Sequence, residues 1–296
     1  MNSIALVTGG TGFVGRHVVR ALAGKGCAVR AVIRDGKRDS LPSDANYEAI
    51  IESPDIFNEP AEWWSHACHG VDAVIHIAWY AEPGKYLTSP LNRSCLTGTC
   101  ALAAGAIDAG VNRFVGIGTC FEYDVSQCLL TTATPLKPTT LYAATKAAAF
   151  FTLSQMCADA GVAFAWCRLF YLHGDGEDPR RLVPYVRAQI AAQNPVELTH
   201  GNQIRDYMNV TDAAKHIVEI TASSKVGPVN VCSGQPRTVR QFVESIADET
   251  GSRHLLRFGA RNENLSDPPC VVGEPLILSQ NRALDRRSVS CSEELS

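Results

Sequence analysis

The chain has no Cys-x-x-Cys pair, although eleven of its 296 residues are cysteine. The closest grouping of metal-binding residue types is His66-Ala67-Cys68-His69, and no further ligands stand at the spacing of a zinc site. We therefore interpret this group as structural and expect no metal. Basic residues are not in excess either, since the formal net charge is −3. This balance argues against nucleic acid as a partner, because proteins that bind it present a basic surface.

Long apolar runs are missing as well. No segment approaches the roughly 18 residues of a membrane span, and Lys146 interrupts the nearest candidate. An apolar strand pattern begins at residue 3, so we expect no signal peptide and no membrane partner. These absences predict a cytoplasmic protein whose cysteines are reduced, buried thiols.

Strand and helix patterns alternate regularly over the first 169 residues. The strand patterns lie near residues 3–8, 28–33, 47–51, 72–77, 112–118 and 163–169. This alternation predicts an α/β fold with a doubly wound parallel sheet of Rossmann type and a ligand site at the carboxyl ends of its strands. We expect this domain over residues 1–169, a smaller and partly interleaved substrate-binding lobe over 170–275, and a disordered tail over 276–296. Helical patterns near 180–193, 211–223 and 238–250 are assigned to the smaller lobe.

A glycine-rich turn follows the first strand, in the sequence Thr8-Gly9-Gly10-Thr11-Gly12-Phe13-Val14-Gly15. Glycine permits a tight turn and a close approach of the backbone to phosphate oxygens. The free amides at the start of the next helix also favour an anion. A turn without a ligand is the alternative, but the strand before it and the helix after it favour dinucleotide binding. We predict contacts from Gly9, Thr11, Gly12, Phe13, Val14 and Gly15.

The end of the second strand bears on which cofactor binds. An NAD-binding protein usually carries an acidic residue there for the ribose hydroxyls, whereas this chain has Ile33 followed by Arg34. A guanidinium pairs well with the 2′-phosphate of NADP, and Arg16 adds charge nearby. The alternative is a solvated basic loop. We favour NADP(H) over NAD(H).

A second motif, Tyr142-Ala143-Ala144-Thr145-Lys146, places a phenol and an ammonium one helical turn apart. The ordinary pKa of tyrosine is about 10, and a neighbouring lysine favours the phenolate. This arrangement suits general acid–base catalysis beside a hydride carrier. The pair could also be incidental on an amphipathic helix.

With these two motifs in this order, residues 3 to 275 resemble the extended short-chain dehydrogenases/reductases, also called the NAD-dependent epimerase/dehydratase family. The resemblance implies a third catalytic residue, Thr119, which ends a strand four residues before Tyr123. It also implies cofactor contacts from Asp55, Ile56 and Ala78. Arg205, in Arg205-Asp206-Tyr207-Met208-Asn209, matches the arginine that grips the diphosphate of a nucleotide sugar. Tyr80, Tyr86, Tyr171 and Arg180 are expected around the sugar, with Tyr171 and Arg180 as substrate contacts.

Departures from the family narrow the expected reaction. Dehydratases of the family have an Asp-Glu pair directly after the catalytic Thr, where this chain has Cys120 and Phe121. The related decarboxylases need a Glu at the second of these positions. The 3,5-epimerase-reductases use a Cys one residue later than Cys120 and a His where this chain has Gly176. A simple 4-keto reductase or a 4-epimerase remains.

The resemblance therefore implies NADP(H)-dependent reduction or oxidation at C4 of a nucleotide-activated 4-keto-6-deoxyhexose, with a dTDP-hexose as the expected partner. A nucleotide-sugar 4-epimerase is the alternative enzyme. A non-catalytic NADP(H) sensor or scaffold is a third reading, against which Thr119, Tyr142 and Lys146 argue. Small residues are frequent over 97–109 and 143–160, the helices that form a dimer interface in the family, so we expect a homodimer.

Overall fold

The computed structural model describes residues 3–264 and 267–276. The predicted disordered tail over 276–296 therefore lies outside the described residues, apart from Leu276. The membrane prediction can be examined over the described part, where no helix is both long and apolar enough to span a bilayer.

A seven-stranded sheet forms the centre of the larger part of the molecule, with the order β11-β7-β5-β4-β1-β2-β3. All of its neighbouring strands are parallel. The strands are β1 (Ile4–Thr8), β2 (Ala28–Arg34), β3 (Tyr47–Ser53), β4 (Ala73–His76), β5 (Arg113–Thr119), β7 (Ala163–Leu169) and β11 (Gly227–Val231). The order runs outward in both directions from β1 and β4, which confirms the predicted doubly wound sheet and places a ligand crevice at that switch point.

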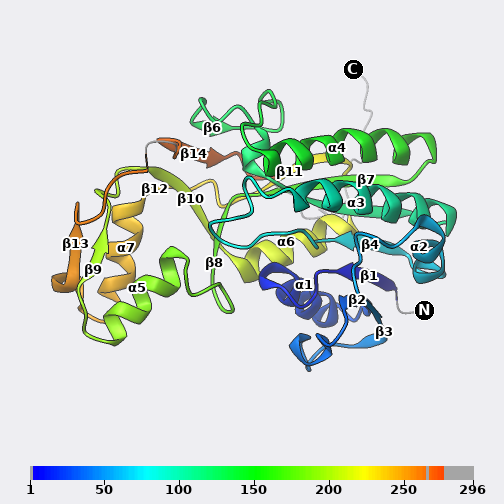
Figure 1. Cartoon of the computed structure of the whole chain (residues 1–296), viewed down its shortest axis with the longest axis horizontal. Helices are drawn as coiled ribbons and strands as arrows, with labels where there is room; N and C mark the ends of the chain where they lie inside the picture. Colours follow the sequence, from blue (N-terminus) through cyan, green and yellow to red (C-terminus); the bar gives the residue numbers. More distant parts are fainter. Residues whose placement is uncertain (1–2, 265–266, 277–296) are drawn as a thin grey trace, which may run out of the picture.

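Side chains alternate across this sheet and build a separate core on each face. In β1, Ala5 and Val7 point to one core and Leu6 points to the other. The first core is covered by α1 (Phe13–Gly24) and α6 (Val210–Ala222), and the second by α2 (Ala61–Cys68), α3 (Leu91–Asp108) and α4 (Leu141–Asp159). Figure 1 shows these two groups of helices on opposite sides of the strands.

Two elements differ from the sequence-based expectation. β11 was not predicted, because Pro228 and Asn230 interrupt its apolar pattern; as the edge strand beside β7 it tolerates a proline. α6, which we assigned to the smaller lobe, packs on the large sheet instead. Its residues Ala213 and Ile217 belong to the same core as Val18 of α1.

The smaller lobe is built around α5 (Leu182–Ala191) and α7 (Val239–Asp248), which share a core with the β9 and β13 ribbon (Figure 1). β9 (Val196–Leu198) and β13 (Leu256–Phe258) pair in parallel. The chain enters this lobe after β8 (Tyr171–His173) and returns to the large sheet through β10 (Ile204–Asn209), α6 and β11. The lobe is therefore made of two segments, with α6 and β11 between them in sequence.

A second sheet connects the two parts of the molecule. Its strand order is β12-β10-β14-β6, and β8 also pairs with β10. The additional strands are β6 (Leu129–Leu130), β12 (Pro236–Thr238) and β14 (Cys270–Gly273). β14 lies between β10 of the smaller lobe and β6, which follows β5 in sequence.

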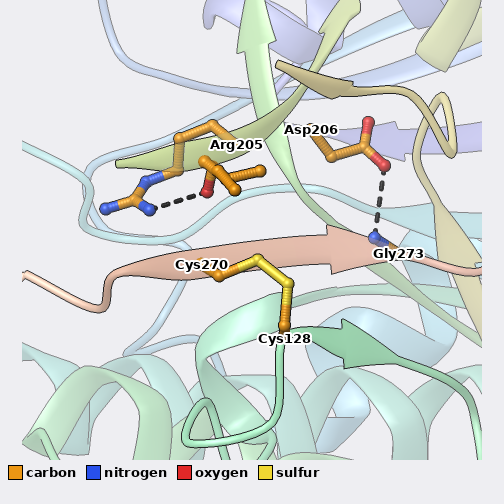
Figure 2. Close-up of a disulfide and its surroundings, with 6 residues drawn as sticks. Cys128, Arg205, Asp206, Cys270 and Gly273 are labelled. Atoms are coloured by element: carbon orange, nitrogen blue, oxygen red, sulfur yellow. Dashed lines mark hydrogen bonds between the residues drawn. A yellow bond between two sulfur atoms is a disulfide. The ribbon is translucent and has the colours of Figure 1, made fainter. Parts of the chain in front are cut away.

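A disulfide joins Cys128 to Cys270, with their Cα atoms 4.8 Å apart (Figure 2). The prediction that the cysteines are reduced thiols is therefore wrong for this pair. The two positions are 142 residues apart, and only the pairing of β6 with β14 brings them together. Eight other cysteines of the described part are free thiols, and six of them are buried.

Candidate active site

The glycine-rich turn has the shape that a dinucleotide needs. Gly9 has a φ of +74°, and a Cβ there would lie 2.7 Å from the backbone nitrogen of Ala78. A Cβ on Gly15 would lie 2.0 Å from the carbonyl oxygen of Gly9. α1 begins at Phe13, and no side chain of the described residues caps it at Gly12. Its first amides are thus left for an anion.

One large cavity, of about 1270 Å³, begins at this turn and extends to the smaller lobe. It exceeds the roughly 300–1,000 Å³ of an ordinary small-molecule site. The cavity brings together most of the predicted site residues. These are Gly9, Thr11, Gly12, Phe13, Val14, Gly15, Arg34, Asp55, Ile56, Ala78, Thr119, Tyr142, Lys146, Tyr171 and Arg205.

Two predicted contacts are not in the cavity wall. The guanidinium of Arg16 donates hydrogen bonds to the carbonyls of Gly12 and Thr11, at 3.3 and 3.2 Å, so it braces the glycine turn. Arg180 is exposed, and its guanidinium donates two hydrogen bonds to the carboxylate of Asp178. Glu82 is a second ion-pair partner, at 3.6 Å. The neighbouring Arg181 lines the cavity instead. The structure thus places Arg16 and Arg180 outside the cavity wall, and their contacts with the cofactor and the substrate stay predictions.

Arg34 and Asp55 lie at the far end of the cavity from the smaller lobe. Arg34 ends β2 with an exposed side chain, for which the described residues provide no ion pair or hydrogen-bond partner. Asp55 follows β3 and accepts hydrogen bonds from the amide of Phe57 and the side chain of Asn58, at 3.0 and 2.8 Å. These bonds fix the turn that places Ile56 against the cavity.

His76 was not singled out from the sequence, yet it fixes the segment that carries Ala78. Burial lowers the pKa of His76 to about 3, so the imidazole is neutral. It bonds Thr8 through Nδ1 and Thr99 through Nε2, each at 2.8 Å. The Thr8 oxygen in turn accepts from the amides of Ile77 and Ala78. Thr99 donates its hydroxyl proton to the backbone carbonyl of Cys95, so its oxygen can only accept from the imidazole. We therefore assign the imidazole proton to Nε2.

Thr119, Tyr142 and Lys146 meet in the cavity from two elements. Thr119 ends β5, whereas Tyr142 and Lys146 lie one turn apart near the start of α4. Thr140 caps that helix by accepting a hydrogen bond from the amide of Ala143 at 3.2 Å. Burial raises the pKa of Tyr142 above its usual range, and a hydrogen bond with the side chain of Thr119 opposes this rise. The two hydroxyls therefore form one polar site.

Lys146 is only 3 % exposed, and its ammonium donates a hydrogen bond of 2.6 Å to the carbonyl of Ile117. The ring of Trp79 lies against the same nitrogen, with its centroid 3.8 Å away. Burial lowers the pKa of Lys146 to about 7. The lysine thus changes charge near neutral pH, which suits a group that assists proton transfer.

The acidic residue nearest to Thr119 in sequence, Glu122, is turned into the protein. It pairs with Arg168 at 2.7 Å and accepts hydrogen bonds from the Trp166 indole and the Thr119 amide. Glu122 and Arg168 are both fully buried, so this carboxylate anchors the end of β5 and is not offered to a substrate. Cys120 lines the cavity, and burial raises its pKa to about 12. The positions that follow Thr119 therefore carry no base.

Arg205 enters the cavity from β10 of the smaller lobe and is 2 % exposed. It donates to the carbonyl of Ile204 at 2.8 Å and forms an ion pair with Asp267 at 2.7 Å. The nitrogen in that ion pair, Nη2, is not aligned for a hydrogen bond with any described residue. Figure 2 shows Asp206 pointing in another direction, to the amide of Gly273. The alternation of β10 thus turns the arginine toward the cavity.

The predicted substrate contact Tyr171 shares the cavity with four residues that had no clear signal in the sequence. The hydroxyl of Tyr171 is buried and has no hydrogen-bond partner among the described residues, and one oxygen of Glu177 is in the same state. Burial raises the pKa of Glu177 to about 7. Trp79, Arg181 and Asp267 also line the cavity. The four residues without a sequence signal, Trp79, Glu177, Arg181 and Asp267, lie in loops or next to the start of a helix, where periodicity gives no indication of side-chain direction.

Comparison with known proteins agrees with this geometry. Residues 5–232 match the NAD dependent epimerase/dehydratase family. The chain is 25% identical over 248 residues to dTDP-6-deoxy-L-talose 4-dehydrogenase (NAD(+)) of Aggregatibacter actinomycetemcomitans, covering 82% of this chain and 89% of that protein. It is 28% identical over 293 residues to the UDP-glucose 4-epimerase of Corynebacterium glutamicum, covering 90% and 86%.

Solved structures have the same architecture. UDP-N-acetylglucosamine 4-epimerase from Methanobrevibacter ruminantium, in complex with UDP-N-acetylmuramic acid, superposes with a TM-score of 0.81 at 22% identity. The match covers 93% of this chain and 90% of that one, and it supports the fold. MoeE5, in complex with UDP-glucuronic acid and NAD, superposes with a TM-score of 0.76 at 25% identity, covering 92% and 90%.

Proposed function

Because the chain belongs to the NAD dependent epimerase/dehydratase family, we propose that it is an NADP(H)-dependent oxidoreductase acting at C4 of a nucleotide-activated 4-keto-6-deoxyhexose. A dTDP-hexose is the proposed substrate, as in dTDP-6-deoxy-L-talose 4-dehydrogenase. One observation carries this proposal: Thr119, Tyr142 and Lys146 share a cavity with the glycine turn, and no acidic residue directly follows Thr119.

The chain's own residues divide the work in the following way. Gly9, Gly12 and Gly15 bind the pyrophosphate of the nicotinamide cofactor, which when bound supplies or takes up the hydride. Thr119 holds the C4 oxygen of the sugar by a hydrogen bond. Tyr142 gives a proton to that oxygen in reduction and takes it back in oxidation. The ammonium of Lys146 stabilises the phenolate form of Tyr142.

Dehydration is disfavoured by the groups that follow Thr119. Loss of water from a sugar needs an acid for the departing hydroxyl and a base for the proton. Cys120 holds its proton because burial raises its pKa to about 12, and Phe121 has no titratable group. Glu122 is already paired with Arg168. Simple transfer of a hydride and a proton at C4 therefore fits the site better.

The cofactor proposal depends on Arg34. This guanidinium has no partner among the described residues, and it lies at the end of β2, where a carboxylate would repel a 2′-phosphate. NADP(H) is therefore the proposed cofactor. Among similar proteins, MoeE5 and the UDP-glucose 4-epimerase of Thermus thermophilus were solved as complexes with NAD, and the talose dehydrogenase is named for NAD(+).

The 4-epimerases give the second candidate function. Several relatives are UDP-glucose 4-epimerases, the Corynebacterium glutamicum protein among them. An epimerase oxidises and reduces C4 in turn, so it regenerates its cofactor and consumes none. A preference for NADP(H) favours the dehydrogenase, because a reaction with net oxidation or reduction exchanges its cofactor with the solution at every turnover.

We also propose that two copies of the chain associate through α3 and α4. These helices pack against each other, and Phe151 on α4 is 61 % exposed. A large exposed aromatic side chain beside a surface of small residues suits a helix-packing interface. Sedimentation equilibrium of the purified protein measures this directly.

A substrate panel tests the proposed reaction. dTDP-, CDP-, GDP- and UDP-4-keto-6-deoxyhexoses are each incubated with NADPH and with NADH, and cofactor absorbance is followed. We expect NADPH to be consumed fastest with the dTDP sugar. Tyr142→Phe protein is the matched control, because it removes only the phenolic hydroxyl. Interconversion of C4 epimers without net cofactor consumption would instead establish the epimerase.

A further inference from the structure

Residues 77–90, between β4 and α3, form no helix or strand, yet they contact both side chains of the Tyr142–Lys146 pair. A segment without the backbone hydrogen bonds of a helix or a sheet needs other interactions to keep one conformation. The contacts of Trp79, Tyr86 and Asn92 supply them.

Trp79 faces Lys146 with its ring. The ring centroid lies 3.8 Å from Nζ, well within the roughly 6 Å over which a cation is attracted to an aromatic face. A second indole, Trp166, is 5.8 Å away. Because the ammonium is buried, the attraction to Trp79 is stronger than it would be at a surface.

Asn92 fixes the orientation of the Trp79 ring through a hydrogen bond to its indole nitrogen. It is 0 % exposed, and its carbonyl oxygen accepts a hydrogen bond of 2.8 Å from the indole nitrogen of Trp79. Its amide nitrogen donates to the carbonyls of Tyr86 and Ser89, at 2.6 and 2.9 Å. Both ends of the segment are therefore tied to one buried side chain on the first turn of α3.

The same segment contacts Tyr142. The carbonyl of Leu87 accepts a hydrogen bond of 3.0 Å from the Tyr142 amide. The ring of Tyr86 meets the ring of Tyr142 edge to face, with centroids 4.8 Å apart. Movement of residues 86–89 would thus displace the phenol, just as movement of Trp79 would take the aromatic face away from the ammonium.

No carboxylate of the described residues forms an ion pair with Lys146. The titratable groups around it are His76 at the end of β4, Cys95 on α3, Glu122 after β5 and Tyr142 on its own helix. The imidazole is neutral, burial raises the pKa of Cys95, and Glu122 is engaged by Arg168. The Glu122 carboxylate raises the pKa of Lys146 without contacting it, so the aromatic face of Trp79 and the Ile117 carbonyl are the groups that stabilise the charge by direct contact.

We propose that Trp79, held by Asn92, is a positioning residue that keeps the Lys146 ammonium charged and aimed into the cavity. This inference deepens the proposed function, because it concerns the same proton-transfer pair. It can nevertheless be tested without any substrate, since the titration of Lys146 can be followed in the protein alone.

The test follows lysine ¹³Cε resonances by NMR as the pH is varied. The signal of Lys146 is identified by its absence from Lys146→Met protein. In Trp79→Leu we expect the pKa of Lys146 to fall by about half to one and a half pH units, because the cation loses its aromatic partner. Trp79→Phe keeps a ring and should give a smaller fall. Asn92→Ala should shift the pKa in the same direction, because the indole is no longer held.

Trp63→Phe is the matched control, because Trp63 lies on α2 against Trp64 and should leave the Lys146 titration unchanged. An unaltered pKa in both Trp79 variants would overturn the proposal, and an unaltered pKa in Asn92→Ala alone would overturn the part assigned to Asn92. The wild-type substrate panel gives a separate result: a shifted titration without turnover of any 4-keto sugar would reject the proposed reaction and leave this inference standing.

Discussion

Tyr142 is the residue on which the proposed chemistry depends most directly. Tyr142→Phe removes the exchangeable proton and keeps the ring that packs against Tyr86. We expect turnover to fall by about 10²–10⁴-fold, the usual contribution of a general acid–base group, with little change in NADPH affinity. Steady-state kinetics and a binding titration measure the two effects. Tyr185→Phe is the control, because Tyr185 is half-buried against the core of the smaller lobe and does not line the cavity. A Tyr142→Phe enzyme with more than half of the wild-type turnover would remove Tyr142 from the mechanism.

Arg34 decides the proposed choice of cofactor. Arg34→Ala should weaken NADPH by about 10-fold or more and leave NADH nearly unchanged, because a charge-assisted bond to the 2′-phosphate contributes about 1.5–3 kcal/mol. Dissociation constants for both cofactors test this. Arg38→Ala removes a charge outside the cavity wall and controls for general electrostatics. Equal affinity of the wild-type protein for NADH and NADPH would contradict the proposal and strengthen the epimerase alternative.

Arg205 is the proposed anchor for the substrate diphosphate. Arg205→Ala should raise KM for the nucleotide sugar by about 10-fold or more and scarcely alter NADPH affinity, since the glycine turn lies on the other part of the molecule. Arg205→Lys should restore binding only in part, because lysine lacks the planar fork. Arg180→Ala is a suitable control, because the Arg180 side chain lies outside the cavity wall and is held by Asp178. Equal losses for cofactor and sugar would assign Arg205 to structure.

At the scale of elements, the sequence predicted those helices, strands and turns that are determined by residues close together in the chain. The six strands that alternate with helices were found from apolar runs, and the glycine turn and the Tyr142–Lys146 spacing needed only a strand or a helix around them. β11 and α6 depend on long-range packing instead. α6 is amphipathic wherever it lies, and its partner face on α1 is about 200 residues away, so its sequence could not show which core it joins.

The same limit applies to the site. Arg180 and Arg181 are adjacent and chemically alike, and only the turn before α5 determines which of them lines the cavity. The pairing of Cys128 with Cys270 left no spacing signal at all. Trp79 and Asn92 are thirteen residues apart in a segment without periodicity, and their contact needs the fold of residues 77–90.

β14 holds the second sheet together, so the disulfide at its first residue should affect this element first. Cys128→Ser should lower stability by about 2–5 kcal/mol, because the unfolded chain regains the freedom of a long loop. Thermal unfolding without reductant measures the loss. Cys27→Ser, which removes a free thiol near the surface, should change the melting temperature much less. If reductant lowers the melting temperature of wild-type and Cys128→Ser protein equally, the disulfide does not contribute as described.

For the whole molecule, the buried Lys146 links stability to pH. Lysine has a pKa of 10.5 in the unfolded chain, and burial lowers it to about 7 in the folded protein. Between these values the unfolded chain binds more protons at this position, so the lysine makes stability rise with pH above about 7, by at most about 1.4 kcal/mol per pH unit. Lys146→Met lacks this contribution. Urea unfolding of both proteins from pH 6.5 to 8.5 should show the wild type gaining on the variant as pH increases. A constant difference between them would contradict the lowered pKa.

The disulfide also closes part of the chain into a covalent ring. Cys128 and Cys270 close a ring whose two ends are 142 residues apart in sequence, and α4, α5, α6 and α7 all lie inside it. A protease that cuts one peptide bond within this ring opens it without separating the two fragments. The loops of the smaller lobe lie within the ring, so a nick there yields a protein that migrates as a single band until a reductant divides it.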